Sequence, residues 1–296
     1  MEFLKKEEVL SMAQKARRQE DFVSFCMRAE DIDSNVLNAL LPLMCSLDVI
    51  LSPVEKNNVL LFDKKLYSKK AALLNDSGLV WGIKMDFGLK KNDTFKAFRE
   101  RLDFACELYP NHIIFPQIED SSSLPPSSAL YSSKDLDFSR GMAFACRTFY
   151  TAGRAVPWFN SILKALKINA SSFFADFDEW QQCNNCSFIT GFVPENESHA
   201  SIEKMQLNFL EEKFSEKNKR HLFTPVSDIV RLNGAFSRVI QEGEESVLNL
   251  SYDPDYLLSP YALDINRFFD NVTMEECRVK VFLKDGDVSI KKDRAD

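Results

Sequence analysis

The chain has 296 residues, a formal net charge of −7 at pH 7, and 45% apolar and 27% charged residues. This composition is typical of a globular protein with one large domain or two ordinary ones. The negative charge argues against nucleic acid as a partner, because binding to a phosphate backbone needs a cationic surface. No apolar run approaches the roughly 20 residues of a membrane helix, and the N-terminus MEFLKKEEVL lacks the apolar run of a signal peptide. We expect no membrane partner and a cytoplasmic location.

Four strands alternate with helices in the first 120 residues. The predicted strands cover 22–27, 48–51, 80–87 and 112–117, and the predicted helices cover 3–19, 34–44, 69–75 and 95–108. The strand starts recur about every 30 residues with a helix in each interval, as right-handed βαβ crossovers require. We therefore expect an α/β fold in which residues 1–120 form a partial parallel (β/α) barrel of about four strands.

The character of the chain changes after this region. Residues 121–135 are rich in Ser and Pro, which predicts a linker or long surface loop. Strand signals then fade, and residues 136–272 are predicted to form a mainly helical domain, with helices at 138–154, 156–166, 205–217, 225–241 and 261–271. Residues 273–296 alternate polar and apolar residues around Asp285-Gly286, which predicts a β-hairpin and a tail.

The seven cysteines are odd in number and scattered, and most lie among apolar neighbours. This pattern predicts reduced, buried thiols. Cys183-Asn-Asn-Cys186 is the only CxxC pair, whereas a structural zinc site needs about four ligands. We expect two loop thiols there and no metal site.

Ligands of parallel α/β sheets bind at the carboxyl ends of the strands. The residues found there are Arg28 and Glu30, Ser52, Asp86 and Gly88, and Gln117 and Glu119. Arg28 could clamp a carboxylate, Asp86 could accept a hydrogen bond from a ribose or amino group, and Gly88 would let the backbone approach a ligand. Any one of them alone is explained by an ordinary solvent-facing strand end. Together they predict a small-molecule pocket that contains Arg28, Ser52, Asp86, Gly88 and Gln117.

No catalytic residue is predicted. No histidine stands near an acidic partner and a nucleophile at a recognisable local spacing, and no P-loop or dinucleotide glycine fingerprint occurs. His112 begins a buried strand, and the sequence favours a satisfied core histidine over a base.

Met85-Asp86-Phe87-Gly88-Leu89, followed by Asp93-Thr94-Phe95 and a helix, resembles the later part of the barrel in the radical S-adenosylmethionine superfamily. In that family a strand ends in a Gly-Leu-Pro turn before a capped helix. The upstream stretch FDKKLYSKKAALLNDSGL resembles the preceding helix, and Arg147 to Trp180 resembles post-barrel segments of cobalamin-associated members. The resemblance covers most of residues 20–180.

The chain also departs from that family. Lys90 replaces the proline, and the cluster-binding CxxxCxxC occurs nowhere. The resemblance implies S-adenosylmethionine, an iron–sulfur cluster and cobalamin as cofactors of the family. Cleavage of S-adenosylmethionine needs the cluster, so we expect no cofactor chemistry from this chain alone.

The leading hypothesis is a radical-enzyme-like protein without its own cluster, either part of a split enzyme or a degenerate homologue that kept a small-molecule pocket. An exposed sheet edge at 22–27 predicts an N-terminal half-barrel chain or a homodimer as partner, or a covering helix at 3–19. One alternative is a non-catalytic binding or interaction module that uses this edge. Another is an unrelated small-molecule enzyme on an α/β scaffold.

Overall fold

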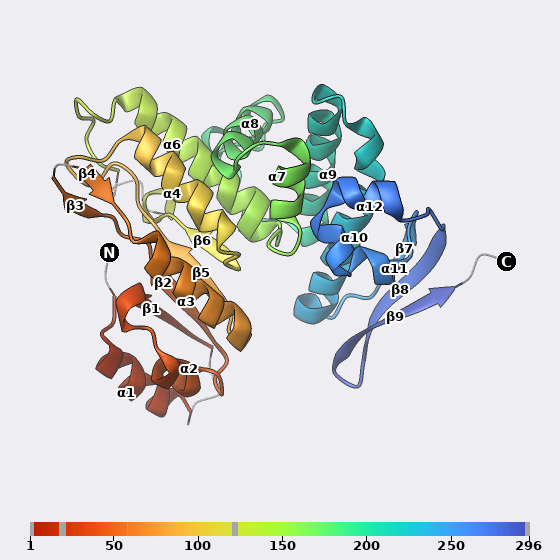
Figure 1. Ribbon diagram of the computed structural model, residues 1–296, viewed down its shortest axis with the longest axis horizontal. Helices are drawn as coiled ribbons and strands as arrows, with labels where there is room; N and C mark the ends of the chain where they lie inside the picture. Colours follow the sequence, from red (N-terminus) through yellow and green to blue (C-terminus); the bar gives the residue numbers. More distant parts are fainter. Residues whose placement is uncertain (1–2, 18–21, 58, 120–123, 294–296) are drawn as a thin grey trace. The chain divides into compact units, whose positions relative to one another are not determined.

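The computed structural model describes residues 3–17, 22–57, 59–119 and 124–293 (Figure 1). The chain forms two compact units, Met1–Arg147 and Thr148–Asp296. The division falls after the predicted linker, of which residues 121–123 lie outside the described part. Tyr131 of that stretch is buried, and a Cβ at Gly88 would lie 3.1 Å from Pro125. The described part of the Ser/Pro-rich stretch therefore packs against the first unit.

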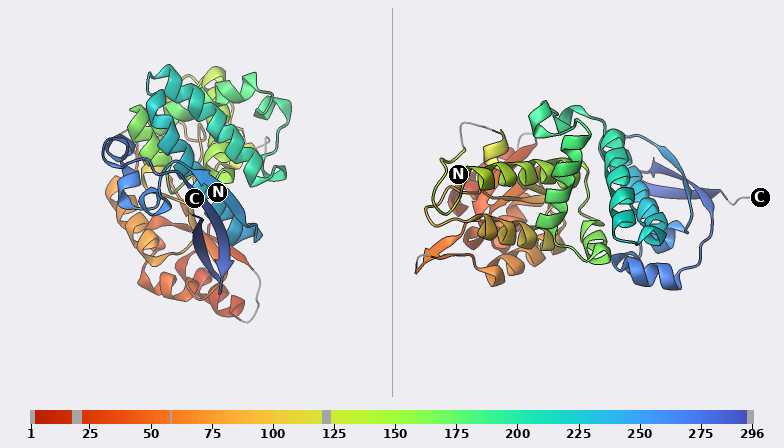
Figure 2. Two further views of the ribbon diagram at one scale, coloured as in Figure 1. Left: turned by 90° about the vertical axis from the view of Figure 1, so that its right-hand side faces the viewer. Right: turned by 90° about the horizontal axis from the view of Figure 1, so that it is seen from above.

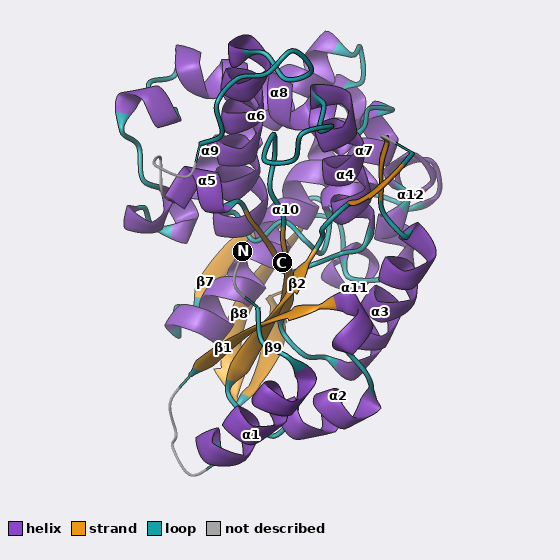
Figure 3. Ribbon diagram, turned by 90° about the vertical axis from the view of Figure 1, so that its left-hand side faces the viewer, coloured by secondary structure: helices purple, strands orange, loops and turns teal. Residues whose placement is uncertain are grey.

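A four-stranded parallel sheet lies at the centre of the first unit (Figure 3). Its strands, in spatial order, are β1 (Val23–Arg28), β2 (Cys45–Ile50), β5 (Trp81–Lys84) and β6 (His112–Ile114). The connecting helices are α2 (Ser34–Leu40), α3 (Lys64–Ser77) and α4 (Phe95–Glu107). Right-handed crossovers between neighbouring parallel strands place these helices on one side of the sheet. The predicted parallel sheet is confirmed.

The two faces of this sheet differ in polarity, because successive side chains of a strand point to opposite faces. One face is apolar and buried; it carries Phe25, Met27, Leu47, Val49, Trp81, Ile83 and Ile113. The other face carries Ser24, Cys26, Arg28, Ser46, Asp48, Ile50, Gly82, Lys84, His112 and Ile114. We call this second set the polar face. The helices bury the apolar face, whereas the polar face carries the titratable side chains of the sheet.

The chain's own N-terminal segment contacts the β1 edge. Leu4 N donates a hydrogen bond to Cys26 O (2.8 Å). Helix α1 (Lys6–Ala16) follows and buries Val9 and Ala13. Residues 18 and 19 of the longer predicted helix lie outside the described residues. A covering segment is thus present, and the partner chain stays a prediction.

Several elements of the first unit end where local chemistry stops them. Helix α2 ends at Leu40 because Pro42 cannot continue it, so the predicted helix over 34–44 is too long. Helix α3 starts early because Asp63 caps Leu66 N (2.9 Å). Strand β6 ends at Ile114, and a short helix, α5, spans Pro116–Glu119. A hairpin, β3 (Val54–Lys56) and β4 (Val59–Leu61), was not predicted.

Helix α6 (Ser133–Cys146) completes the first unit, and a π-helical turn spans Arg147–Ala152. The second unit then contains α7 (Phe159–Leu166), α8 (Ala170–Cys183), α9 (His199–Glu216), α10 (Phe223–Glu242), α11 (Pro254–Leu257) and α12 (Ile265–Asn271). Helices α9 and α10 lie side by side (Figure 2). An antiparallel sheet has the order β7 (Ser246–Leu250), β8 (Cys277–Lys284) and β9 (Asp287–Asp293). The helical region and its terminal hairpin are confirmed, whereas α8 and β7 were not predicted.

Phenylalanines form the core of the second unit. Phe149 is fully buried and meets five aromatic rings at centroid distances of 4.8–6.1 Å, those of Trp158, Phe159, Phe173, Phe177 and Phe209. Most of these pairs are edge-to-face, the arrangement that the ring quadrupole favours. Throughout the described ranges, no helix combines the length and the apolar character needed to cross a membrane.

Candidate functional site

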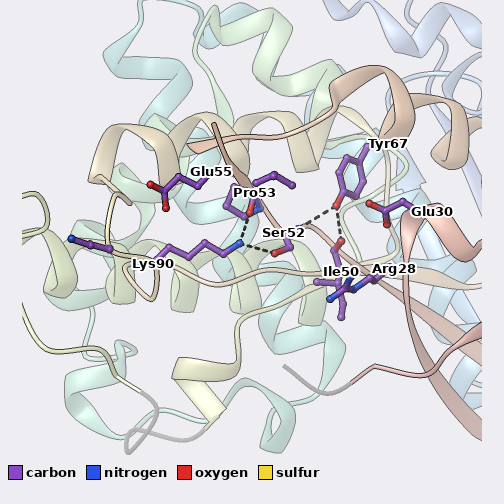
Figure 4. Close-up of a pocket in the computed structure, with 10 residues that line it drawn as sticks. Arg28, Glu30, Ile50, Ser52, Pro53, Glu55, Tyr67 and Lys90 are labelled. Carbon is purple, nitrogen blue, oxygen red and sulfur yellow. Dashed lines mark hydrogen bonds between the residues drawn. The ribbon is translucent and has the colours of Figure 1, made fainter. Parts of the chain in front are cut away.

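A pocket of about 500 Å³ opens at the carboxyl ends of β1 and β2. It is lined by Arg28, Glu30, Ile50, Ser52, Pro53, Val54, Glu55, Tyr67, Lys90 and Lys91 (Figure 4). The sequence predicted Arg28 and Ser52 here, at the ends of two neighbouring parallel strands. It missed Tyr67 and Lys90, which come from a helix and from the loop after β5.

Lys90 is one of the basic residues that line this pocket. Its Nζ donates hydrogen bonds to Ser52 Oγ (3.0 Å) and to Pro53 O (Figure 4). Both acceptors are uncharged, and no ion pair of Lys90 occurs among the described residues. An ammonium group that is oriented by neutral oxygens keeps its charge available for an anionic ligand.

Tyr67 fixes the end of β2. Its hydroxyl donates to Ile50 O (2.8 Å) and accepts from Ser52 N (3.2 Å). Burial raises the pKa of Tyr67 to about 12, so the hydroxyl stays protonated and remains a donor at neutral pH. The backbone that presents Ser52 to Lys90 is therefore held by a buried side chain.

The pocket carries charges of both signs. Arg28 lies with its guanidinium 4.1 Å from the centroid of the Phe3 ring, which leaves its N–H edge free to bind an anion. Lys91 is exposed at the rim. Of the two acidic residues, Glu55 accepts from Asn92 Nδ2 (2.6 Å), while Glu30 is exposed. Three basic and two acidic side chains suit a ligand that bears an anionic group.

Asp86, predicted to face a ligand, instead lies buried beside a buried ion pair. Arg101 Nη1 and Nη2 donate to Asp93 Oδ1 (2.9 Å) and Oδ2 (2.8 Å), and Nη2 also donates to Asp86 O (3.0 Å). The Asp86 side chain is 5% exposed, and burial raises its pKa although Arg101 opposes the shift. Asp86 does not line the strand-end pocket.

Gly88 and Gln117 also lie outside the lining of the pocket. Gly88 has φ of +68°, and its missing Cβ leaves room for Leu136, 2.9 Å away, rather than for a ligand. Gln117 is fully buried and donates from Nε2 to Phe87 O (2.9 Å). The Glu119 side chain lies outside the described residues. The predicted residues thus do not form a single pocket. Arg28 and Ser52 line the strand-end pocket, whereas Asp86, Gly88 and Gln117 lie outside it.

A second group of polar side chains lies on the polar face. Cys26, Asp48, Gly82 and His112 are register partners across the four strands. His112 Nε2 lies 2.6 Å from Asp48 Oδ1. The sequence predicted a satisfied core histidine, and His112 does have a hydrogen-bonding partner. The sequence did not predict that His112 lies on a partly exposed face beside Asp48, because Asp48 is 64 residues away.

The second unit has a cavity of about 560 Å³ with an acidic rim. His199, at its base, is 7% exposed, and Arg238 Nη1 lies 3.2 Å from His199 Nδ1. A guanidinium can only donate, so Nδ1 accepts. Burial, together with Arg154 and Arg238, lowers the pKa of His199 to about 4, so this imidazole is neutral at pH 7.

This shifted histidine predicts a pH dependence of stability. The folded pKa of His199, about 4, lies below the ordinary value of 6.5. Between these values the unfolded chain binds more protons, so the His199 contribution is present above pH 6.5 and is lost as the pH falls towards 4. We expect the difference in unfolding free energy between the protein and its His199→Gln variant to shrink by about 2–3 kcal/mol across this window. Urea titrations at the two ends of this pH window measure the difference in unfolding free energy. A difference that does not change with pH would contradict the prediction.

In the ranges that the structure describes, no three His, Cys, Asp or Glu side chains are grouped so that they could hold a metal ion. Cys183 is exposed at the end of α8, whereas Cys186 is buried. These two thiols do not fit an iron–sulfur cluster, which needs several thiolates.

No protein-family model, curated protein or solved structure matches the chain. The resemblance to radical S-adenosylmethionine enzymes therefore stays a prediction from the sequence.

Proposed function

We propose that the first unit binds a small molecule bearing a carboxylate or phosphate group in the strand-end pocket. The observation that carries this proposal is the Lys90 ammonium, which is held by two neutral oxygens, Ser52 Oγ and Pro53 O. A charged group that is already oriented binds an anion with little further ordering cost. The position supports the same conclusion, because ligands of open parallel sheets bind at the carboxyl ends of the strands.

The sheet supports a further part of the proposal. Strand order follows chain order, from β1 through β2 and β5 to β6, which is the arrangement in a segment of a (β/α) barrel. We infer that the first unit is a partial barrel of the radical-enzyme type that lacks its own cluster. In that case the ligand is S-adenosylmethionine or a related metabolite, with its amino-acid carboxylate at Lys90 or Arg28 and its ammonium at Glu30 or Glu55. A cytoplasmic location accompanies this proposal.

Lys90→Met tests the proposal. Methionine keeps much of the aliphatic stem but removes the charge, so affinity for an anionic probe should fall by about 1.5–3 kcal/mol, the usual contribution of a hydrogen bond to a charged group. Isothermal titration calorimetry with phosphate, citrate and S-adenosylmethionine measures the change.

Lys65→Met is the matched control, because Lys65 is an exposed lysine on α3 that does not line the pocket. It should leave the affinity unchanged. If none of the probes binds at millimolar concentration, or if Lys90→Met and Lys65→Met bind alike, the pocket is not an anion site. Binding of S-adenosylmethionine alone would favour the radical-enzyme ancestry over a general anion site.

A further inference from the structure

Asp48 and His112 contact each other across β5, a strand to which neither residue belongs. Asp48 lies on β2 and His112 on β6, with Gly82 of β5 between them in the same register row. The two side chains meet over this glycine at 2.6 Å. A Cβ at position 82 would lie 2.2 Å from His112 Nε2. The glycine therefore makes the contact possible, because any larger residue would occupy the space of the imidazole ring.

This pair has the geometry of a histidine oriented by a carboxylate. Asp48 engages Nε2, which leaves Nδ1 as the nitrogen available for proton transfer. Within the described part of the chain, no hydrogen bond of His112 Nδ1 is found. The side chains of His112 and Asp48 are 20% and 13% exposed, so both are largely desolvated yet reachable. A carboxylate in this position sets the tautomer and stabilises the imidazolium once a proton is taken up.

A cationic side chain, that of Lys84, lies on the same face. Lys84 is two residues after Gly82 on β5, so both point to the polar face. No ion pair of Lys84 is present in the portion of the chain described by the structure. Cys26, in the row of Asp48, is a protonated thiol at neutral pH, because burial raises its pKa although Lys84 opposes the shift. The thiol is thus a poor nucleophile, whereas Lys84 can stabilise a negative charge.

Two residues of the polar face also line the strand-end pocket. Arg28 and Ile50 line that pocket, and they follow Cys26 and Asp48 by two residues on the same strands. Two residues of strand correspond to about 6.6 Å. A ligand whose anionic group binds at Arg28 must therefore extend about five bonds further, over about 6.6 Å, to reach the row of the Asp48–His112 pair.

We propose that His112, oriented by Asp48, is the general base of a proton-transfer reaction on the ligand of the strand-end pocket. A C–H or O–H bond of the ligand breaks, its proton forms an N–H bond at His112 Nδ1, and the electron pair stays on the ligand facing Lys84. Asp48 balances the charge of the imidazolium, and the proton returns to the ligand or to water. This inference rests on the proposed function, since the pocket supplies the anchor.

Histidine acylation by diethyl pyrocarbonate tests this inference without any ligand. The reagent acylates unprotonated imidazole, and the chain has three histidines, which peptide mass spectrometry separates. The rate at His112 relative to exposed His221 is the readout. At a pH at which the imidazole is unprotonated in both proteins, Asp48→Asn should lower this ratio about tenfold, because Asp48 stabilises the positive charge that develops on the ring during acylation. Gly82→Ala should lower it too, because the new Cβ displaces the ring while both members of the pair remain.

The outcomes show whether Asp48 activates the imidazole of His112, as a general base requires. Ser46→Ala, one row along β2 on the same face, is the control and should leave the ratio unchanged. Circular dichroism confirms that each variant is folded. An unreactive His112, or equal ratios in the protein and in Asp48→Asn, would overturn the inference. Because no ligand is used, such a result is distinct from a failure of Lys90→Met to weaken anion binding.

Discussion

Phe149→Ala is expected to destabilise the second unit by about 3–5 kcal/mol, the usual cost of removing a buried aromatic ring. Phe149 is 0% exposed and lies between Phe173 (4.8 Å) and Phe177 (4.9 Å), with Phe209 at 6.1 Å. The surrounding rings are themselves packed against one another, for example Phe173 with Phe209 at 5.2 Å. They cannot collapse into the space that the alanine leaves, so the cavity persists and its full cost is retained.

Hydrogen exchange during urea unfolding measures this effect, because peptides from α8 report on the second unit separately from peptides of the first. Phe269→Ala is the matched control in the same unit, since Phe269 is 37% exposed. It should cost less than about 1 kcal/mol, as substitutions outside a packed core usually do. A loss for Phe149→Ala no greater than that for Phe269→Ala would show that the aromatic cluster is not the core of this unit.

Arg101→Met is expected to destabilise the first unit by about 3–5 kcal/mol, because it leaves a buried carboxylate without its partner. The side chains of Arg101 and Asp93 are both 1% exposed. Asp93 would lose both hydrogen bonds from the guanidinium, and Asp86 O would lose its donor. Asp93 Oδ2 would still accept from Gly88 N (2.8 Å), which satisfies only part of the charge.

The same unfolding measurement, read on α4 peptides, tests this effect. Lys96→Met on the same helix is the control, because Lys96 is 87% exposed and 3.9 Å from Glu100. An exposed pair of this kind contributes about 0–1 kcal/mol. If Arg101→Met costs no more than Lys96→Met, the buried pair does not hold the loop after β5.

The two ionic features of the first unit have different consequences. Arg101 and Asp93 neutralise each other in the interior, so their contribution is structural and binds the β5 loop to α4. Lys90, on the same loop, has neutral hydrogen-bond partners among the residues that the structure describes, and it lines the strand-end pocket. The loop after β5 therefore carries two charged residues with different roles. Asp93 stabilises the fold through Arg101, and Lys90 is available to a ligand.

The sequence by itself determined the order and direction of the strands in the first unit. Apolar runs about 30 residues apart, each followed by an amphipathic helix, admit little besides parallel crossovers. It also placed Arg28 and Ser52 at the ends of their strands, because the carboxyl end of a strand can be located from its pattern. The hairpin at Asp285-Gly286 was predictable for a similar local reason: both residues have positive φ, which glycine and aspartate tolerate.

Only the tertiary structure decided which polar residues meet. Asp86, Gly88 and Gln117 follow the same rule as Arg28, yet they lie outside the pocket and contact Arg101, Leu136 and Phe87 respectively. Asp48 and His112 are 64 residues apart and meet only because strand register places Gly82 between them. Local patterns fix where a strand ends and which face a side chain takes. Register and the packing of distant segments fix its partners, and these depend on the whole fold.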